Sequence, residues 1–596
     1  MAPPLTAMDA DRFQQHAKAL LTPLYGERSE EVLRRLLRLI EAQGARLSHR
    51  HGARNELWSE KDQWLILYGD SLIDEHESRS DSGQETSPKP PLAVLDDFLH
   101  SRLAGVFSGV HVLPFFPWSS DDGFSVIHYR EVDPALGEWR DIRRLASRHD
   151  LMVDLVLNHV SRESLWFADY LGGNLPGRDY FIEMDPETDL SDVVRPRSSP
   201  LLVPVSTRRG VRHLWATFSE DQIDLNFANP DVLIEFIGIL LFYLQQGARI
   251  VRLDAVAFLW KRPGTRCIHL PETHAVVRLL RAIVDHVAPG TLIITETNVP
   301  HAENISYFGL EREHTPPDEA HLVYQFPLPP LLLHTLTSGE AGTIARWLNT
   351  LPELPEGCSY LNFTASHDGI GVRPLEGWLE QHEIDALVGL MQRFGGFVSM
   401  RRQSDGSDSP YELNITWFDA MSGTRRGPDP WQVERFLLSQ HLMLVLKGIP
   451  GVYIHCLTAT QNDHDGVERS GRLRSINRKR WQRQELGMLL DSRHTPTREV
   501  FVALTRRLEL RRREPCFHPD AAQTVVPTAP QLLAIQRGPI ASGRRLLAIH
   551  NVTDRPQPLV MAELERPGWE DLLEGGEWRH CDTLAPYRSL WLVRHD

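Results

Sequence analysis

Three carboxylates stand at the ends of apolar runs in the middle of the chain. Asp254 follows ARIVRL, Glu296 follows TLIIT, and Asp368 closes SYLNFTASHD. Runs of Val, Ile and Leu without strict alternation are typical of strands buried on both faces, and the carboxyl ends of such parallel strands meet at one face. We therefore expect the three side chains to converge on one pocket. Such a set suits the cleavage of a glycosidic bond, which needs a nucleophile, a proton donor and anionic support for a cationic transition state.

Arginine and histidine accompany these carboxylates. Arg252 precedes Asp254 by two residues, so on a strand both side chains point to the same face, where the guanidinium can hold the carboxylate ionised and oriented. His159 follows another apolar run, and His367 directly precedes Asp368. Any one of these carboxylates can be interpreted as a helix cap or a surface ion pair, but the whole set in this order favours an active site.

Eight apolar runs separated by helical stretches follow the first 60 residues. Eight such runs with helical crossovers predict an α/β fold, a (β/α)₈ TIM barrel. The runs cover residues 64–69, 109–117, 151–160, 248–258, 291–297, 322–329, 359–368 and 448–455. The third and the seventh are followed by spacings too long for simple crossovers, which predict two inserted loop subdomains at the mouth of the barrel.

The remaining segments complete the expected domain organisation. EEVLRRLLRLIEAQ has helical spacing of apolar residues, and we interpret it as an amphipathic helix packed on the main domain rather than as a partner-binding helix. The short strand-like runs near the end of the chain predict a C-terminal β domain. The expected order is a helical extension (1–60), the first barrel part (61–160), an inserted subdomain (161–230), the middle barrel part (231–368), a second inserted subdomain (369–430), the last barrel part (431–513) and the β domain (514–596).

Composition excludes several classes of partner. Of 596 residues, 41% are hydrophobic, and 64 Lys and Arg against 79 Asp and Glu give a formal charge of −15. Neither nucleic acid nor an anionic membrane attracts an acidic chain, so we expect neither as a partner. Five dispersed cysteines without a CxxC motif favour reduced thiols, and the first residues lack the features of a signal peptide, so we expect a cytoplasmic protein. No metal-ligand spacing is present in the sequence, and we expect no metal site.

Seven motifs resemble a known family. DLVLNHV, RIVRLDAVAF, IITETN and NFTASHD resemble the four signature regions of the α-amylase family, glycoside hydrolase family 13. HVLPFFPWSSDDGF, YQFPLPPLLLH and SHDGIGV are similar to its sucrose-phosphorylase subfamily. The resemblance covers nearly the whole chain after the first 60 residues and implies a retaining α-glucoside phosphorylase. Such an enzyme needs no cofactor, and it transfers a glucosyl unit to inorganic phosphate to give α-D-glucose 1-phosphate.

The resemblance also implies roles for individual residues. Asp254 would be the nucleophile, Glu296 the general acid/base and Asp368 the stabiliser of the transition state. The residues that would hold the glucosyl unit are Arg252, His159, His367, the pair Asp121 and Arg474 at its far end, and Phe124 as its stacking platform. A pocket closed at the far end implies that one glucose is removed from a small substrate. Phosphate is an anion among carboxylates and needs a cation, which Arg197 would supply together with Tyr411.

The departures from the subfamily pattern concern the leaving group. Asn298 stands where sucrose phosphorylases have histidine, and Phe258 where they have tyrosine; Ser409 and Glu412 replace their fructose contacts. Relatives with similar motifs include phosphorylases of glucosylglycerate, glucosylglycerol and sucrose 6′-phosphate. Glu412 would repel an anionic leaving group whereas Arg197 would attract one, so the residues leave the choice open. We expect a glucoside of a glycerol-type acceptor, with glucosylglycerate or glucosylglycerol as the substrate.

Other functions remain as alternatives. Within the same chemistry they are a sucrose phosphorylase, a sucrose 6′-phosphate phosphorylase, and a hydrolase or transglucosidase of α-glucosides. A non-catalytic barrel is a further alternative, but such proteins usually lose a catalytic carboxylate, and all three are present here. The expected partners are a small-molecule glucoside and phosphate, and a homodimer is left open.

Overall fold

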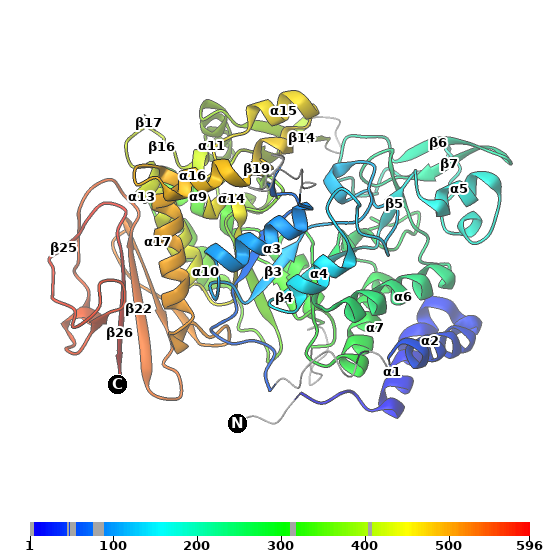
Figure 1. Cartoon of the computed structure of the whole chain (residues 1–596), viewed down its shortest axis with the longest axis horizontal. Coiled ribbons are helices and arrows are strands. Elements are labelled where there is room, and N and C mark those ends of the chain that lie inside the picture. Colours follow the sequence, from blue (N-terminus) through cyan, green and yellow to red (C-terminus); the bar gives the residue numbers. More distant parts are fainter. Residues whose placement is uncertain are drawn as a thin grey trace, which may run out of the picture.

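The centre of the molecule is a closed barrel of eight parallel strands (Figure 1). The structure is a computed structural model, which describes residues 5–44, 47, 55–74, 89–309, 317–402 and 408–595. The barrel strands, in spatial order, are β1 (Trp64–Leu67), β3 (Gly109–Val112), β4 (Asp150–Val156), β9 (Ala248–Asp254), β10 (Leu292–Thr295), β11 (Leu322–Tyr324), β12 (Ser359–Phe363) and β18 (Ile449–Tyr453). All eight predicted runs supply a strand, and the predicted (β/α)₈ barrel is confirmed.

The side chains inside the barrel change from apolar to charged along its axis. Apolar side chains fill one part, among them Met152, Ile250 and Ile294, all at most 1% exposed. Two residues further along β4 and β9, the register places Asp154 opposite Arg252. The charged layer therefore begins where the apolar filling ends, at the carboxyl ends of the strands, which is where active sites of this fold lie.

Helices cover the outside of the barrel, and two more helices precede it. α6 (Pro230–Gln246) and α7 (Pro271–Val287) belong to the outer layer, with α3 (Pro91–Arg102), α9 (Leu328–Ser338), α13 (Gln432–Val445) and α17 (Pro496–Arg511). The N-terminal helices α1 (Ala10–Tyr25) and α2 (Ser29–Gly44) contact α7 and α6 respectively. The Tyr25 hydroxyl donates to the Phe227 carbonyl at 2.9 Å, and Arg35 forms an ion pair with Asp231 at 2.6 Å. The N-terminal extension is thus packed on the barrel, as predicted.

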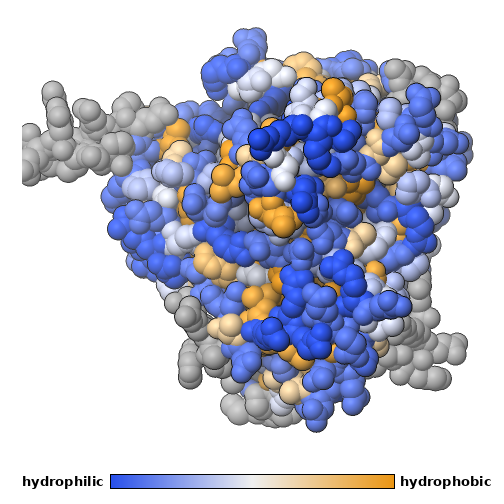
Figure 2. All heavy atoms as spheres, turned by 90° about the vertical axis from the view of Figure 1, so that its right-hand side faces the viewer, coloured by the Kyte–Doolittle hydropathy of each residue, from blue (hydrophilic) through white to orange (hydrophobic). Residues whose placement is uncertain are grey.

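The first insertion leaves the barrel earlier than the third apolar run indicates. β4 ends at Val156, and β5 (His159–Ser161) turns away to pair antiparallel with β8 (Gln222–Asp224). Within the insertion lie α5 (Leu165–Gly172) and the hairpin of β6 (Leu202–Thr207) and β7 (Gly210–Trp215). His159 is therefore held by a small sheet of the insertion and not by a barrel strand. The face of the molecule that carries these elements is largely hydrophilic with scattered apolar groups (Figure 2).

The second insertion and the C-terminal region are built from antiparallel strands. β13 (Ile370–Gly371), β15 (Asp408–Asn414) and β14 (Phe397–Arg402) form a three-stranded sheet, with α11 (Gln381–Arg393) beside it. The C-terminal domain is a five-stranded sheet in the order β20 (Gln523–Val526), β21 (Leu532–Arg537), β22 (Arg544–Asn551), β26 (Ser589–His595) and β24 (Glu570–Asp571). In the part of the chain that the structure describes, no helix is both long and apolar enough to cross a bilayer.

Candidate active site

Asp254 ends strand β9 and is held by a buried chain of charged groups. Arg252 Nη1 donates to Asp254 Oδ1 and to Asp154 Oδ1, both at 2.6 Å, and Asp154 Oδ2 lies 2.7 Å from His111 Nε2. The Tyr324 hydroxyl accepts a further bond from Arg252 Nε at 3.2 Å. Burial raises the pKa of Asp254, and the neighbouring guanidinium opposes this effect. Arg252 therefore fixes the orientation of Asp254 and supports its ionised form.

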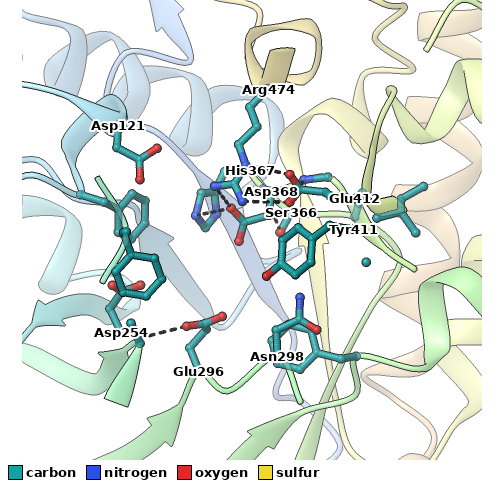
Figure 3. Close-up of a pocket in the computed structure, with 18 of the residues that line it drawn as sticks. Asp121, Asp254, Glu296, Asn298, Ser366, His367, Asp368, Tyr411, Glu412 and Arg474 are labelled. Carbon is teal, nitrogen blue, oxygen red and sulfur yellow. Dashed lines mark hydrogen bonds and ion pairs between the residues drawn. The ribbon is translucent and has the colours of Figure 1, made fainter. Parts of the chain in front are cut away.

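Glu296 follows strand β10 and lies beside Asp254 (Figure 3). Its Oε2 accepts the backbone N–H of Ala255 at 3.0 Å, and Ala255 has a left-handed backbone with φ of 48°. This conformation is strained for a residue with a Cβ, and such strain is concentrated at functional sites. Burial raises the pKa of Glu296 to about 7, an effect to which the carboxylate of Asp254 adds. At neutral pH this carboxyl group can both donate and accept a proton, which general acid/base catalysis requires.

Arg474, on the 3-10 turn Leu473–Asn477, lies between Asp368 and Glu412 (Figure 3). Its Nη1 is 2.7 Å from Asp368 Oδ1, while Nε and Nη2 donate to the two carboxylate oxygens of Glu412 at 3.0 and 2.9 Å. Burial alone would raise the pKa of Asp368, but Arg474 and His367 hold it far below its usual range. Asp368 is therefore ionised, as a stabiliser of positive charge must be.

Glu412 is a buried partner of Arg474 and not an isolated charge. It is 3% exposed, and Gly369 N–H donates to its Oε1 at 3.0 Å. A Cβ on Gly369 would lie 2.5 Å from Glu412 Cγ, so glycine is required for this approach. The charge of Glu412 is compensated in part, because Arg474 contacts it with two donors but also forms an ion pair with Asp368. The expected repulsion between Glu412 and an anionic leaving group is therefore weakened by Arg474.

The opposite wall of the pocket carries Phe124. Its ring stacks on His367 with centroids 4.8 Å apart and planes 7° apart, and its carbonyl accepts from His159 Nε2 at 2.9 Å. Gln222, from β8 of the insertion, lies 3.2 Å from the same histidine nitrogen and donates to Asp121 Oδ2 at 3.3 Å. The first insertion thus orients two of the predicted glucose contacts.

Asp121 reaches the pocket from a strained turn. Asp121 and Asp122 both have left-handed backbones, with φ of 53° and 47°, and the following Gly123 has φ of 109°. Asp122 anchors the turn through ion pairs with Arg472 at 2.8 Å and with Arg478. Asp121 faces Arg474 across the pocket (Figure 3). The ion pairs of Arg474, however, are with Asp368 and Glu412.

The predicted phosphate residues lie together at the other side of the pocket. The guanidinium of Arg197 is 5.6 Å from the ring centroid of Tyr411. Among the described residues, Arg197 has no hydrogen-bond or ion-pair partner, although it lines the pocket. Asn298 lies beside Tyr411 (Figure 3), and its Oδ1 is buried and unpartnered within the described chain. A free guanidinium next to a hydroxyl can receive an anion.

Two predicted leaving-group contacts lie outside this pocket. Phe258 lines a neighbouring chamber and packs edge-on against Phe218 with centroids 5.5 Å apart. Ser409 lies behind Arg401 and accepts from its Nε at 3.2 Å. Neither residue lines the pocket of the three carboxylates, whereas Asn298 and Tyr411 do.

Several residues of the site were not predicted from the sequence. Asp154 is the one acid within the apolar run LMVDLVLNHV, and that exception was a usable signal. Gln222 and Phe218 come from the first insertion, where no periodicity marks them. The Lys261 side chain is 2% exposed and donates to Asn158 Oδ1 at 2.7 Å, and only the fold reveals its place behind the site.

Comparisons with known proteins agree with this geometry. Residues 105–368 match the family model described as "Alpha amylase, catalytic domain". The chain is 45% identical to a glucosylglycerate phosphorylase from Allomeiothermus silvanus, over 96% of this chain and 97% of that protein. It is 31% identical to a sucrose phosphorylase from Agrobacterium vitis, over 66% and 80% respectively. The solved structure of sucrose 6F-phosphate phosphorylase from Thermoanaerobacter thermosaccharolyticum superposes with a TM-score of 0.69 at 24% identity, covering 83% of this chain and 94% of that one.

Proposed function

The chain belongs to the α-amylase family, as expected from its motifs, and from this membership we propose that it is a glucosylglycerate phosphorylase. It transfers a glucosyl unit from glucosylglycerate to inorganic phosphate and releases α-D-glucose 1-phosphate. The observation that carries the proposal is the 45% identity to a glucosylglycerate phosphorylase over nearly the whole of both chains, combined with an intact set of three carboxylates in one pocket.

The reaction proceeds in two displacements. Asp254 attacks the anomeric carbon while Glu296 donates its proton to the departing glycerate oxygen, and a covalent glucosyl-enzyme forms. Phosphate then enters, Glu296 accepts a proton, and phosphate displaces Asp254 with net retention of configuration. A Glu296 pKa of about 7 supports this assignment, because both protonation states are populated at neutral pH. Asp368, held ionised by Arg474, stabilises the positive charge in both transition states.

The second half-reaction requires a place for phosphate. Arg197 and Tyr411 supply it in this proposal, since the guanidinium lies over the Tyr411 ring and has no ion-pair partner among the described residues. A phosphorylase also needs phosphate to compete with water, and a positioned cation raises the local concentration of the anion. Hydrolysis or transglucosylation would need no such cation, and this favours phosphorolysis over both alternatives.

An anionic leaving group is compatible with the pocket. Arg474 compensates part of the charge of Glu412, which weakens the repulsion between this carboxylate and an anionic leaving group. Arg373 and Arg401 line a neighbouring chamber that Tyr411 also lines, and the neutral leaving group of glucosylglycerol carries no charge for them to bind. Glucosylglycerate is thus preferred over glucosylglycerol and over sucrose. We also propose a reducing compartment such as the cytoplasm, because the five cysteines are dispersed and unpaired.

A panel of substrates tests the proposed function. The protein is incubated with phosphate and, separately, with glucosylglycerate, glucosylglycerol, sucrose and sucrose 6′-phosphate, and glucose 1-phosphate is measured. The expected result is a kcat/KM for glucosylglycerate at least about a hundredfold above the other three, the equivalent of one or two charge-assisted contacts. A higher kcat/KM for sucrose or for sucrose 6′-phosphate would overturn the proposed substrate.

A further inference from the structure

The active-site pocket continues into a second chamber beyond Glu296, Asn298 and Tyr411, which line both. Figure 3 shows Asn298 and Tyr411 on the side of the pocket away from Asp121. Because Asp121 is expected at the far end of the glucosyl unit, this second chamber lies on the side where a leaving group departs. We call it the arginine chamber, since its wall includes Arg195, Arg266, Arg373 and Arg401.

Two of these arginines already have carboxylate partners. Arg401 donates to Glu376 at 3.0 Å and to Ser409 at 3.2 Å. Arg266 lies 4.0 Å from Glu303, and its side chain is 58% exposed. Their charges are therefore partly compensated by protein groups or screened by solvent.

Arg373 differs from the other arginines of the chamber. Its Nε is buried and has no hydrogen-bond partner, and the guanidinium forms no ion pair with any described residue. Arg195, by comparison, donates to the Ser199 carbonyl. A buried donor without a partner is costly. A guanidinium of this kind, lining a chamber that opens from an active site, indicates a ligand that supplies the missing acceptor.

The backbone places Arg373 close to Tyr411 and Asn298. β13 pairs with β15, so Gly371 lies opposite Glu412. Val372 N–H donates to the Tyr411 carbonyl at 3.0 Å, and Arg373 begins the next 3-10 turn, Arg373–Leu375. A Cβ on Gly371 would lie 3.3 Å from the Asn298 amide nitrogen. Arg373 is thus attached to the same sheet that carries Tyr411, and its stem begins two residues from the Asn298 contact.

We propose that Arg373 binds the carboxylate of the leaving group and sets the preference of the enzyme for a glycerate over a neutral polyol. This inference rests on the proposed function. The planar guanidinium matches a carboxylate in a bidentate geometry, which a lone ammonium does not. Arg197 and Arg373 then divide two anions between them: Arg197 receives the phosphate above Tyr411, and Arg373 receives the carboxylate in the arginine chamber.

The reverse reaction isolates this contact, because donor and acceptor can be varied separately. α-D-Glucose 1-phosphate is the donor, and D-glycerate or glycerol is the acceptor. In Arg373→Gln the KM for glycerate rises about ten- to a hundredfold, as expected for the loss of a charge-assisted contact, and the ratio of kcat/KM for glycerate over glycerol falls by a similar factor. Arg373→Lys keeps the charge but loses the bidentate geometry, and it recovers part of that ratio.

Arg266→Gln is the matched control, since it removes the same charge from the same chamber at an arginine that already faces Glu303. In this control we expect the ratio of kcat/KM for glycerate over glycerol to change less than about threefold. If this ratio fell equally in Arg373→Gln and Arg266→Gln, the preference for glycerate would come from the overall charge of the chamber, and the inference would be overturned. A rise in the KM for phosphate with an unchanged KM for glycerate would make Arg373 a phosphate ligand and overturn it as well.

The two levels of the proposal fail in different ways. A wild-type protein that does not use glycerate contradicts the proposed function, and the inference falls with it. A wild-type protein that prefers glycerate, together with an Arg373→Gln variant that keeps the preference, contradicts only the inference. Thermal unfolding of each variant identifies any general loss of folding.

Discussion

Three carboxylates in one pocket differ in the state of their protons, and this difference organises the chemistry. Arg474 keeps Asp368 ionised, and burial raises the pKa of Glu296 to about 7. Burial also raises the pKa of Asp254, and the hydrogen-bonded guanidinium of Arg252 opposes that rise. Neighbouring acids whose environments push their pKa values apart are suited to different roles. Glu296 is the one that can change its protonation state during turnover.

The pH dependence of the first displacement follows from Glu296. The reaction needs its protonated form, and raising the pH through about 7 removes that proton. The kcat/KM for glucosylglycerate should therefore fall about tenfold per pH unit above 7. The rate for α-glucosyl fluoride, whose leaving group needs no proton, should lack this alkaline limb. A rate for the glucoside that stays flat from pH 6 to pH 9 would contradict the assignment of Glu296 as the acid.

In the proposed mechanism, Arg197 acts in the second displacement. In Arg197→Ala the KM for phosphate should rise about ten- to a hundredfold, because a charge-assisted contact is lost. Hydrolysis of the glucosyl-enzyme needs no anion site, so the ratio of hydrolysis to phosphorolysis should rise. Both rates are measured at several phosphate concentrations. An unchanged phosphate saturation curve would show that the anion site lies elsewhere.

At the scale of elements, a buried ion pair joins the first insertion to the barrel. Lys261, which follows strand β9, forms an ion pair with Asp224 on β8 and donates to Asn158 at 2.7 Å. Asp224 also accepts the backbone N–H of Thr217 at 2.8 Å and is fully buried. Asp224 lies opposite His159 in the β5–β8 pair. Lys261 thereby helps to position a predicted glucose contact without touching the pocket.

Loss of the lysine should loosen the insertion. Lys261→Met leaves Asp224 as an uncompensated buried charge, which is expected to cost about 3–5 kcal/mol. The measurement is limited proteolysis, in which cleavage within residues 161–230 should become faster, together with a lower midpoint of thermal unfolding. Adding Asp224→Asn to Lys261→Met should restore part of the loss.

Lys18→Met is the control for this change, because Lys18 pairs with Glu30 on the surface and both side chains are more than half exposed. Its effect should stay below about 1 kcal/mol. If the insertion is cleaved at the same rate in wild type and in Lys261→Met, the ion pair is not what holds it.

The elements also show the limits of reading the sequence. The eight strands could be predicted because burial on both faces leaves apolar runs. The departure of β5 from the barrel could not be predicted, because a strand that pairs with a second sheet has the same apolar residues as one that stays in the barrel. The role of Glu412 depends on Arg474, which lies 62 residues further along the chain, and no local pattern reveals such a partner. Arg373 begins a 3-10 turn of the second insertion, and only the fold shows that its guanidinium has no ion-pair partner among the described residues.

At the scale of the whole molecule, the net charge has the same sign as the charge of the proposed substrates. The chain carries a formal charge of −15, and phosphate and glycerate are both anions. The arginine chamber is lined by four arginines against two acids, Asp192 and Glu296, so its lining carries an excess of positive residues, and a cleft can focus the field of such residues on its ligands. The net charge excluded nucleic acid as an expected partner, but it did not reveal this local reversal, because composition carries no positions.

The central claim is that this protein is a retaining phosphorylase of glucosylglycerate, and one time course tests it. Wild-type protein is incubated with glucosylglycerate and phosphate, and the products are followed by NMR, with Asp254→Asn as the blank. The account predicts that the α anomer of glucose 1-phosphate appears together with glycerate, at a rate that depends on phosphate, and that the blank forms no product. Formation of the β anomer, or release of free glucose at a rate independent of phosphate, would contradict it.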